Sequence, residues 1–308
     1  MDRRDSLLAA AVAVIWGINF LVIDWGMTDV PPLLFAAVRF AVVVFPAALL
    51  VPRPEAPWRL VVAVGVFMSL GQFGFLYASI AAGMPPGLAA LVLQAQVIVT
   101  IVIAAGVLRE RPTPAQVVGV VVASTGLIIV ATGRDGRVTF SALGLCLLGA
   151  LSWGLGNVLS RAARLPGGLP LTVWSAMVVP VPLLALSLVL DGPVAIGDAL
   201  GSWGWPATLS TAYTAGLASL VGYGIFNGLL ARNASSAVVP WVLFVPVVAM
   251  TAAWLVLGQS PNAAEALGGL VLVSGALVAL RPVRQPPPRA ERPASSLATG
   301  TRNGEHDT

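Results

Sequence analysis

Apolar blocks, each close to 20 residues long, follow one another along most of this chain of 308 residues. A helix of about 20 apolar residues crosses about 30 Å of hydrocarbon, so each block has the length of a transmembrane helix. Only 10% of the residues are charged and 57% are apolar, which is too little polar surface for a soluble protein of this size. We predict an all-α polytopic membrane protein with ten transmembrane helices, at 6–26, 31–51, 59–80, 87–108, 115–132, 140–160, 170–190, 208–230, 237–257 and 264–280.

The basic residues indicate how the chain is oriented. All 17 are arginines, and with the N-terminus inside, the outer loops receive only Arg134 and Arg137. Short cytoplasmic loops carry an excess of basic residues, so both termini are predicted in the cytoplasm and the protein in the inner or plasma membrane. The net charge of +4 follows from this topology. The sequence contains no soluble domain with a clustered basic face, which a nucleic-acid-binding protein would need.

The residues that are absent exclude several classes of protein. Cys146 is the only cysteine, and the only histidine, His306, lies in a tail at 282–308 whose Pro, Ser and charge predict disorder. An ATP-driven pump needs a P-loop lysine, which this chain lacks, so transport would be secondary. The spans contain neither the HExxH motif of zinc proteases nor the clustered aspartates of lipid transferases. We therefore predict no enzyme activity, no metal and no cofactor.

The second half of the chain repeats the first at an offset of about 150 residues. The matched positions include Gly119 with Gly268, Gly126 with Gly275 and, at a shorter offset, Trp16 with Trp153. Five spans is an odd number, so the second copy must enter the membrane from the opposite side. We predict two inverted repeats, 6–132 and 140–280, an arrangement common in secondary transporters with a substrate site between the halves.

Several segments carry a resemblance to a known family. They are WGINF in the first span, GMPPGLAALVLQAQ at 83–96, LRERPTPAQVVGVVVASTGLIIV at 108–130 and VGYGIFNGLLAR at 221–232. They resemble the EamA family of the drug/metabolite transporter superfamily. The resemblance implies two repeats of five helices and efflux of amino-acid-pathway metabolites such as cysteine and O-acetylserine. This chain has Arg109-Glu110 where the family usually has Gly-Glu, and we interpret Glu110 as a surface ion pair with its flanking arginines.

Arg39 lies near the centre of the second span, where a charged side chain costs roughly 2.5–3.5 kcal/mol. Such a charge must face water, a partner or an anionic substrate. One interpretation is a structural pair with Asp24 or a contact with backbone carbonyls, and the other is a contact with a substrate carboxylate. Asp24 is also the acid inside a span that could take part in proton coupling.

Other polar residues inside the spans predict a substrate cavity. Trp16 and Asn19 are three residues apart and share a helix face, as do Trp153 and Asn157 at a spacing of four. A ring and an amide together suit a small zwitterion. The full set of predicted cavity residues is Trp16, Asn19, Arg39, Gln72, Tyr77, Gln94, Trp153, Asn157, Tyr223 and Asn227. Gln94 and Gln96 are two residues apart and point in different directions, so we do not expect both to contact one ligand. The alternative is that these side chains bind helix to helix.

The sequence favours a secondary transporter that moves a small amino-acid-like substrate across the lipid bilayer by alternating access. Another small metabolite or a drug stays open as the cargo. A phosphorylated or nucleotide-sugar cargo would require several basic residues, and Arg39 is the one found inside a span. A non-transporting scaffold and a homodimer also stay open.

Overall fold

The computed structural model describes residues 1–133, 136, 138–162 and 168–281, and within them the chain is helical and contains no strand. Nine helical runs in this part are long and apolar enough to cross a membrane. They are Arg3–Gly26, Pro32–Leu50, Trp58–Ala81, Pro86–Val107, Pro114–Thr132, Phe140–Ala162, Leu169–Leu190, Trp205–Arg232 and Val239–Leu257. The predicted all-helical polytopic class is therefore confirmed. The predicted tail at 282–308 lies outside the described residues.

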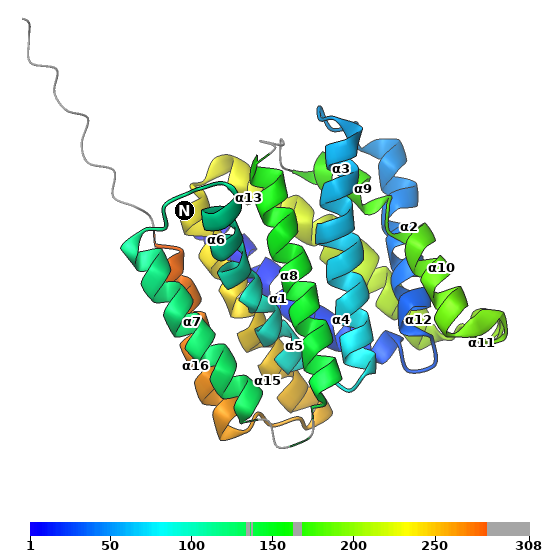
Figure 1. Ribbon diagram of the computed structural model, residues 1–308. Coiled ribbons are helices and arrows are strands. Elements are labelled where there is room, and N and C mark those ends of the chain that lie inside the picture. The colour runs from blue at the N-terminus through cyan, green and yellow to red at the C-terminus, as the bar shows by residue number, and fades with distance from the viewer. Residues whose placement is uncertain (134–135, 137, 163–167, 282–308) are drawn as a thin grey trace, which may run out of the picture.

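The tenth predicted span is a shorter helix, α16 (Ala263–Ala279). Its 17 residues extend about 26 Å at 1.5 Å per residue, slightly less than the hydrocarbon thickness. It packs along α7 (Pro114–Thr132), and the two helices lie side by side in Figure 1. Both begin with a capping box, Thr113 with Gln116 and Asn262 with Glu265, in which side chains bond the free N–H groups of the first turn.

Three further spans are uninterrupted α-helices. They are α1 (Arg3–Gly26), α2 (Pro32–Leu50) and α8 (Phe140–Ala162). The start of α1 is fixed by Asp2, whose carboxylate accepts a hydrogen bond from the backbone N–H of Asp5 at 2.7 Å. At the same end, Asp5 accepts from Arg232 at 3.0 Å and from Asn233 at 2.6 Å, which ties α1 to the end of the eighth run.

Four spans change helix type part of the way across. The third run is α3 (Trp58–Gly65), the π-helical η1 (Val66–Gly71) and α4 (Gln72–Ala81). The eighth is α12 (Trp205–Thr211), the π-helical η3 (Ala212–Gly222) and α13 (Tyr223–Arg232). The fourth is α5 (Pro86–Val92), the 3₁₀ segment η2 (Leu93–Ala95) and α6 (Gln96–Val107). The ninth is the 3₁₀ segment η4 (Val239–Phe244) and α15 (Val245–Leu257), and the short α14 (Ser235–Val238) precedes it. The two π segments, like the two 3₁₀ segments, lie about 150 residues apart.

The seventh run is broken, and the chain after it adds a helix that the predicted spans do not include. α9 (Leu169–Ala176) ends before Pro180, and α10 (Pro180–Leu190) begins there, because proline cannot donate the helical hydrogen bond. The added helix, α11 (Gly192–Gly201), projects beside α10 in Figure 1. Its Gly192 has a φ of 83°, which lets the chain turn sharply after α10.

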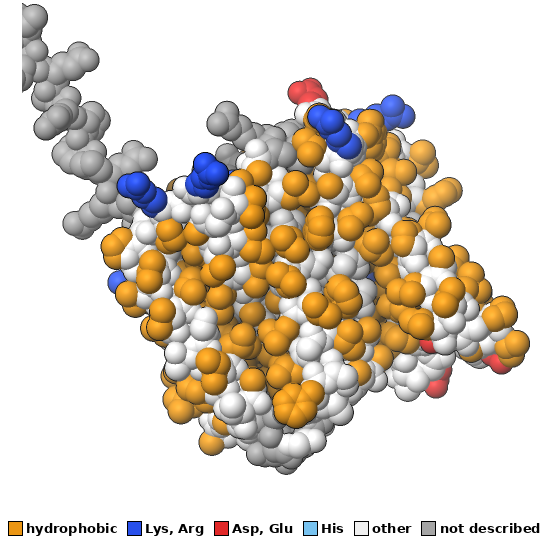
Figure 2. All heavy atoms as spheres, viewed as in Figure 1, with side chains coloured by type: hydrophobic (Ala, Val, Ile, Leu, Met, Phe, Trp, Pro, Cys, Tyr) orange, Lys and Arg blue, Asp and Glu red, His pale blue; other side chains and the backbone are white. Residues whose placement is uncertain are grey.

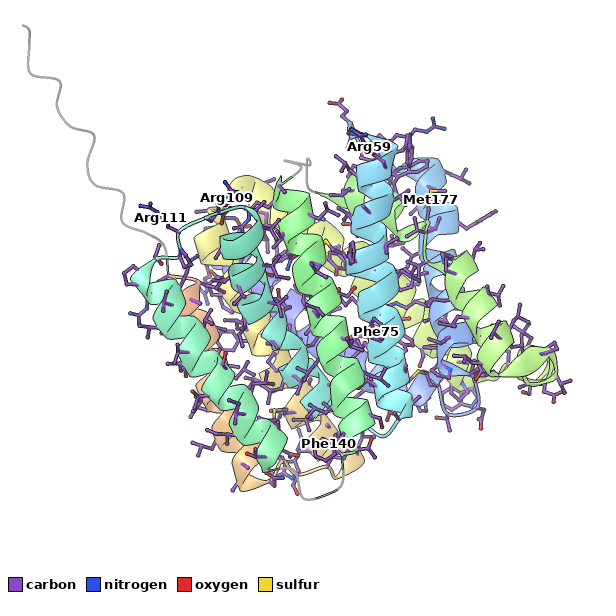
Figure 3. All side chains as sticks on the ribbon, viewed as in Figure 1. Arg59, Phe75, Arg109, Arg111, Phe140 and Met177 are labelled. Atoms are coloured by element: carbon purple, nitrogen blue, oxygen red, sulfur yellow. The ribbon has the colours of Figure 1, made fainter. Side chains whose placement is uncertain are left out.

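The outer surface matches a membrane environment. Large apolar side chains such as Phe45 (79% exposed) and Leu255 (72% exposed) cover it, and Figure 2 shows this cover along the helices. In Figure 3, Arg59, Arg109 and Arg111 lie at one end of the helices and Phe140 at the other. We call the first the basic end.

Candidate functional site

A cavity of about 490 Å³ lies among α1, α4, α6, α8 and α13. This volume is in the range of small-molecule sites, about 300–1,000 Å³. Eight of the ten predicted cavity residues line it: Trp16, Asn19, Arg39, Gln72, Gln94, Trp153, Asn157 and Tyr223. The wall therefore brings together side chains that lie far apart in the sequence and come from both halves of the chain.

The other predicted residues lie off this wall. Tyr77 is fully buried behind it, because its spacing of five from Gln72 puts it on a different face of α4. Asn227 lies one turn beyond Tyr223 on α13, and its side-chain nitrogen is buried with no hydrogen-bond partner among the described residues. Asp24 lines a separate pocket near the far end of α1. Its part in coupling stays a prediction.

Arg39 is 2% exposed, and neutral groups hold its guanidinium. One terminal nitrogen donates to the Tyr77 hydroxyl at 2.8 Å, and the other donates to the Ser219 hydroxyl at 3.2 Å. The ring of Phe73 lies 4.6 Å from the guanidinium carbon, a distance suited to a cation–π contact. Among the described residues no carboxylate forms an ion pair with Arg39.

These contacts correct the structural interpretation of Arg39. Asp24 does not pair with it, and the groups that accept its hydrogen bonds in the described structure are hydroxyls rather than backbone carbonyls. Ser219, which holds Arg39, was not among the predicted cavity residues and does not itself line the cavity. Its spacing of four residues from Tyr223 predicts a shared face on a regular α-helix, but Ser219 lies in the π-helical η3 and only Tyr223 lines the cavity.

Two buried amides in the wall have oxygens that make no hydrogen bond within the described structure. They are Asn19 Oδ1 and Gln94 Oε1. The amide N–H of Gln94 donates a hydrogen bond to the carbonyl of Val242 at 3.4 Å, so the Gln94 oxygen points away from that carbonyl. A buried acceptor without a partner costs about 1–3 kcal/mol, so such groups call for a ligand or water.

Asn157 differs from Asn19 because its amide is already occupied. Its nitrogen donates to Gln96 Oε1 at 2.9 Å and to Thr100 Oγ1 at 3.4 Å, which joins α8 to α6. Gln96 lines the cavity together with Gln94, and whether both contact one ligand stays a prediction. Gln94 lies within the 3₁₀ segment η2 and Gln96 begins α6 directly after it, so the angle between the two side chains differs from that of a regular α-helix.

The two π segments are joined to the opposite half of the chain. Trp16 donates its indole N–H to the carbonyl of Ala218 in η3 at 2.9 Å. Ser152, next to Trp153, donates to the carbonyl of Phe67 in η1 at 2.8 Å. Carbonyls at such irregular turns need partners outside their own helix, and side-chain donors supply them.

The cavity reaches the basic end of the helices. There its wall includes Glu110, Arg111 and Arg161. Glu110 pairs with Arg161 at 3.3 Å, so its partner is on α8 and is not one of the flanking arginines that the sequence suggested. Three arginines thus line the cavity, where the sequence placed only Arg39, although Glu110 offsets the charge of Arg161.

Comparison with known proteins identifies relatives across almost the whole chain. The family model of the EamA-like transporter family matches residues 5–132 and 140–281. A protein of Salmonella typhimurium named "Probable amino-acid metabolite efflux pump" is 38% identical over 89% of this chain and 94% of its own length. The protein of that name from Escherichia coli K12 is also 38% identical, with the same coverage. An uncharacterised transporter of Bacillus subtilis is 27% identical over 86% of this chain and 92% of its own length.

A solved crystal structure shares the fold. It superposes with a TM-score of 0.60 at 22% identity and covers 91% of this chain and 99% of the matched chain. At this identity the likeness concerns the fold alone. The family match over both halves and the two relatives at 38% identity carry the assignment. This chain belongs to the EamA-like transporter family.

Proposed function

We propose that this protein exports small amino-acid-pathway metabolites, similar to cysteine and O-acetylserine, across the inner or plasma membrane by alternating access. The observation that carries the proposal is the cavity, which extends from the buried Arg39 to exposed residues at the basic end. A scaffold protein would not need polar side chains from both halves around one cavity. The names of the two relatives at 38% identity support the substrate class.

The orientation of the proposal follows from charge. Cytoplasmic loops are enriched in arginine, so we assign the basic end and both termini to the cytoplasm. The cavity then faces the cytoplasm, from which an exporter takes its substrate. Uptake from the cytoplasm, closure and opening to the far side complete one cycle.

The alternating-access mechanism rests on two inverted repeats, 6–132 and 140–280. Support comes from matched features about 150 residues apart: the π segments η1 and η3, the 3₁₀ segments η2 and η4, and the capping boxes of α7 and α16. The N-terminus, marked in Figure 1 where α1 begins, and Phe140 at the start of α8, labelled in Figure 3, lie at opposite ends of the helices, which agrees with antiparallel entry of the two copies.

Arg111 and Arg161 at the basic end favour one alternative, a phosphorylated metabolite as cargo. Uptake of labelled L-cysteine and L-phosphoserine into inside-out vesicles distinguishes the two, with vesicles that lack the protein as the control. We expect cysteine uptake above the control and phosphoserine uptake at the control level. If phosphoserine uptake exceeds cysteine uptake, the cargo is a phosphorylated metabolite instead. If neither is taken up above the control, the proposed export of cysteine-like metabolites is refuted.

A further inference from the structure

The buried charge of Arg39 lacks a counter-ion in the described structure. Tyr77 and Ser219 accept hydrogen bonds from it, but both are neutral. The ion pairs found among the described residues join Glu110 to Arg161 and Asp5 to Arg232. A guanidinium buried in a membrane span is expected to pair with an anion, and here the cavity is the space from which an anion can reach it.

The neutral contacts occupy two of the five N–H donors of Arg39 and leave the others for a ligand. The Ser219 hydroxyl donates its own proton to the carbonyl of Thr214 at 2.8 Å, so its lone pairs face the guanidinium. Phe73 lies 4.6 Å from the guanidinium carbon, and the terminal nitrogens are held by Tyr77 and Ser219. The Nε–H is buried and has no partner among the described residues. It can donate to a carboxylate oxygen, as arginine does in its side-on pairs.

The same wall offers groups that suit a cation. Asn19 Oδ1 and Gln94 Oε1 are buried acceptors without a hydrogen-bond partner in the described structure. An ammonium group has three donors and no acceptor, so two amide oxygens match it. The cavity thus presents a donor for an anion and acceptors for a cation.

We propose that the cavity recognises the shared part of a free α-amino acid, with its carboxylate on Arg39 and its ammonium on Asn19 Oδ1 and Gln94 Oε1. This inference rests on the proposed function and assigns its recognition groups. Apolar residues, among them Phe20, Leu93 and Val97, make up much of the remaining wall. They give the substrate side chain few polar partners. Small amino acids with different side chains should therefore be carried at similar rates.

The test compares three molecules that differ by one group each. L-cysteine has both charged groups, cysteamine lacks the carboxylate, and 3-mercaptopropionate lacks the ammonium. Initial uptake into inside-out vesicles is measured for each under the same reducing conditions. We expect cysteine uptake at least tenfold above that of either analogue. Equal uptake of cysteine and either analogue would refute this recognition but not the proposed transport function. Uptake of none of the three would refute the proposed function as well.

Variants of Arg39 locate the carboxylate contact. Arg39→Gln should raise the KM for cysteine at least tenfold and abolish the preference for cysteine over cysteamine, and Arg39→Lys should retain part of both. The matched control is Arg53→Gln, which removes an exposed arginine that lies over Trp174 outside the cavity. An unchanged preference in correctly inserted Arg39→Gln would refute the assignment. If that variant does not fold, Arg39→Lys, which keeps the charge, carries the test of the residue: a preference for cysteine over cysteamine equal to that of the wild-type protein would refute the assignment to the guanidinium, while the three-molecule comparison still tests the recognition of the carboxylate.

A small inorganic anion, in place of a substrate carboxylate, is the alternative partner for Arg39. Thermal unfolding of the purified protein in sodium chloride and in sodium gluconate separates the two sources. We expect the same melting temperature in both salts, and a higher one when L-cysteine is added. Stabilisation by chloride that Arg39→Gln removes, together with no effect of cysteine, would make Arg39 an inorganic-anion site and overturn the proposal.

Discussion

The contact between α7 and α16 allows a quantitative prediction. At Gly275 an added Cβ atom would lie 2.3 Å from the backbone nitrogen of Ala123 and 2.7 Å from the carbonyl oxygen of Gly119. Ordinary contacts begin at 3.4 Å, so Gly275→Ala would force the two helices apart by about 1 Å. The obstacle is backbone, which cannot rotate away as a side chain can.

The expected cost follows from this displacement. Overpacking typically costs about 1–3 kcal/mol, and alanine recovers about 0.5–1 kcal/mol of helix propensity, so the central values leave a net loss of about 1 kcal/mol. The melting temperature should fall by about 2–4 °C. Gly106→Ala is the matched control, because no atom lies within 4 Å of its added Cβ and the same propensity gain should leave the protein equally or more stable.

The assay is the melting temperature of each purified variant in detergent, read from the fraction that remains monodisperse after heating. Gly275→Ala should melt lower than the wild-type protein, and Gly106→Ala should not. Equal melting temperatures for the two variants would contradict the close backbone approach of α7 and α16.

Three further outcomes are expected. Asn19→Ala should reduce cysteine export while membrane levels and melting temperature stay near those of the wild-type protein; Asn157→Ala should lower both export and melting temperature, since Asn157 also bonds Gln96. Glu110→Gln should change stability by less than about 1 kcal/mol, because its pair with Arg161 is about half exposed; a larger loss in thermal unfolding would show a stronger pair. Reporter fusions after residues 30 and 84 should report the outer side and fusions after 55 and 110 the cytoplasm; a reversed pattern would invert the proposed orientation.

The spans could be predicted because the bilayer sets their length and because every residue in hydrocarbon must be apolar or satisfied. The predicted span 31–51 coincides with α2 to within one residue at either end, and 115–132 coincides with α7 equally well. α11 was missed because it is a short helix of 10 residues without the length of a span. Length and hydropathy do not distinguish such a helix from a connection.

Eight of the ten residues predicted to line a cavity do line one, since polar side chains in apolar spans must face protein, water or substrate; their part in substrate binding stays a prediction. The hydrogen-bond partners of these residues could not be predicted from the sequence. Arg39 contacts Tyr77 and Ser219, which are 38 and 180 residues away, and no local spacing encodes such contacts. Gln96 lines the cavity although it was not among the predicted residues, because η2 departs from the regular α-helical angle that sequence reasoning assumes.

Two sets of contacts between the halves differ in kind, and the difference bears on how the halves move. Single side-chain hydrogen bonds join Trp16 to η3 and Ser152 to η1, and each such bond contributes only about 0.6–2 kcal/mol in a membrane. Exchange of one such bond for another is a small change in free energy. α7 and α16, in contrast, meet backbone to backbone, and they cannot slide without a clash at their glycines. We therefore expect the halves to move at the π segments and to pivot on α7 and α16.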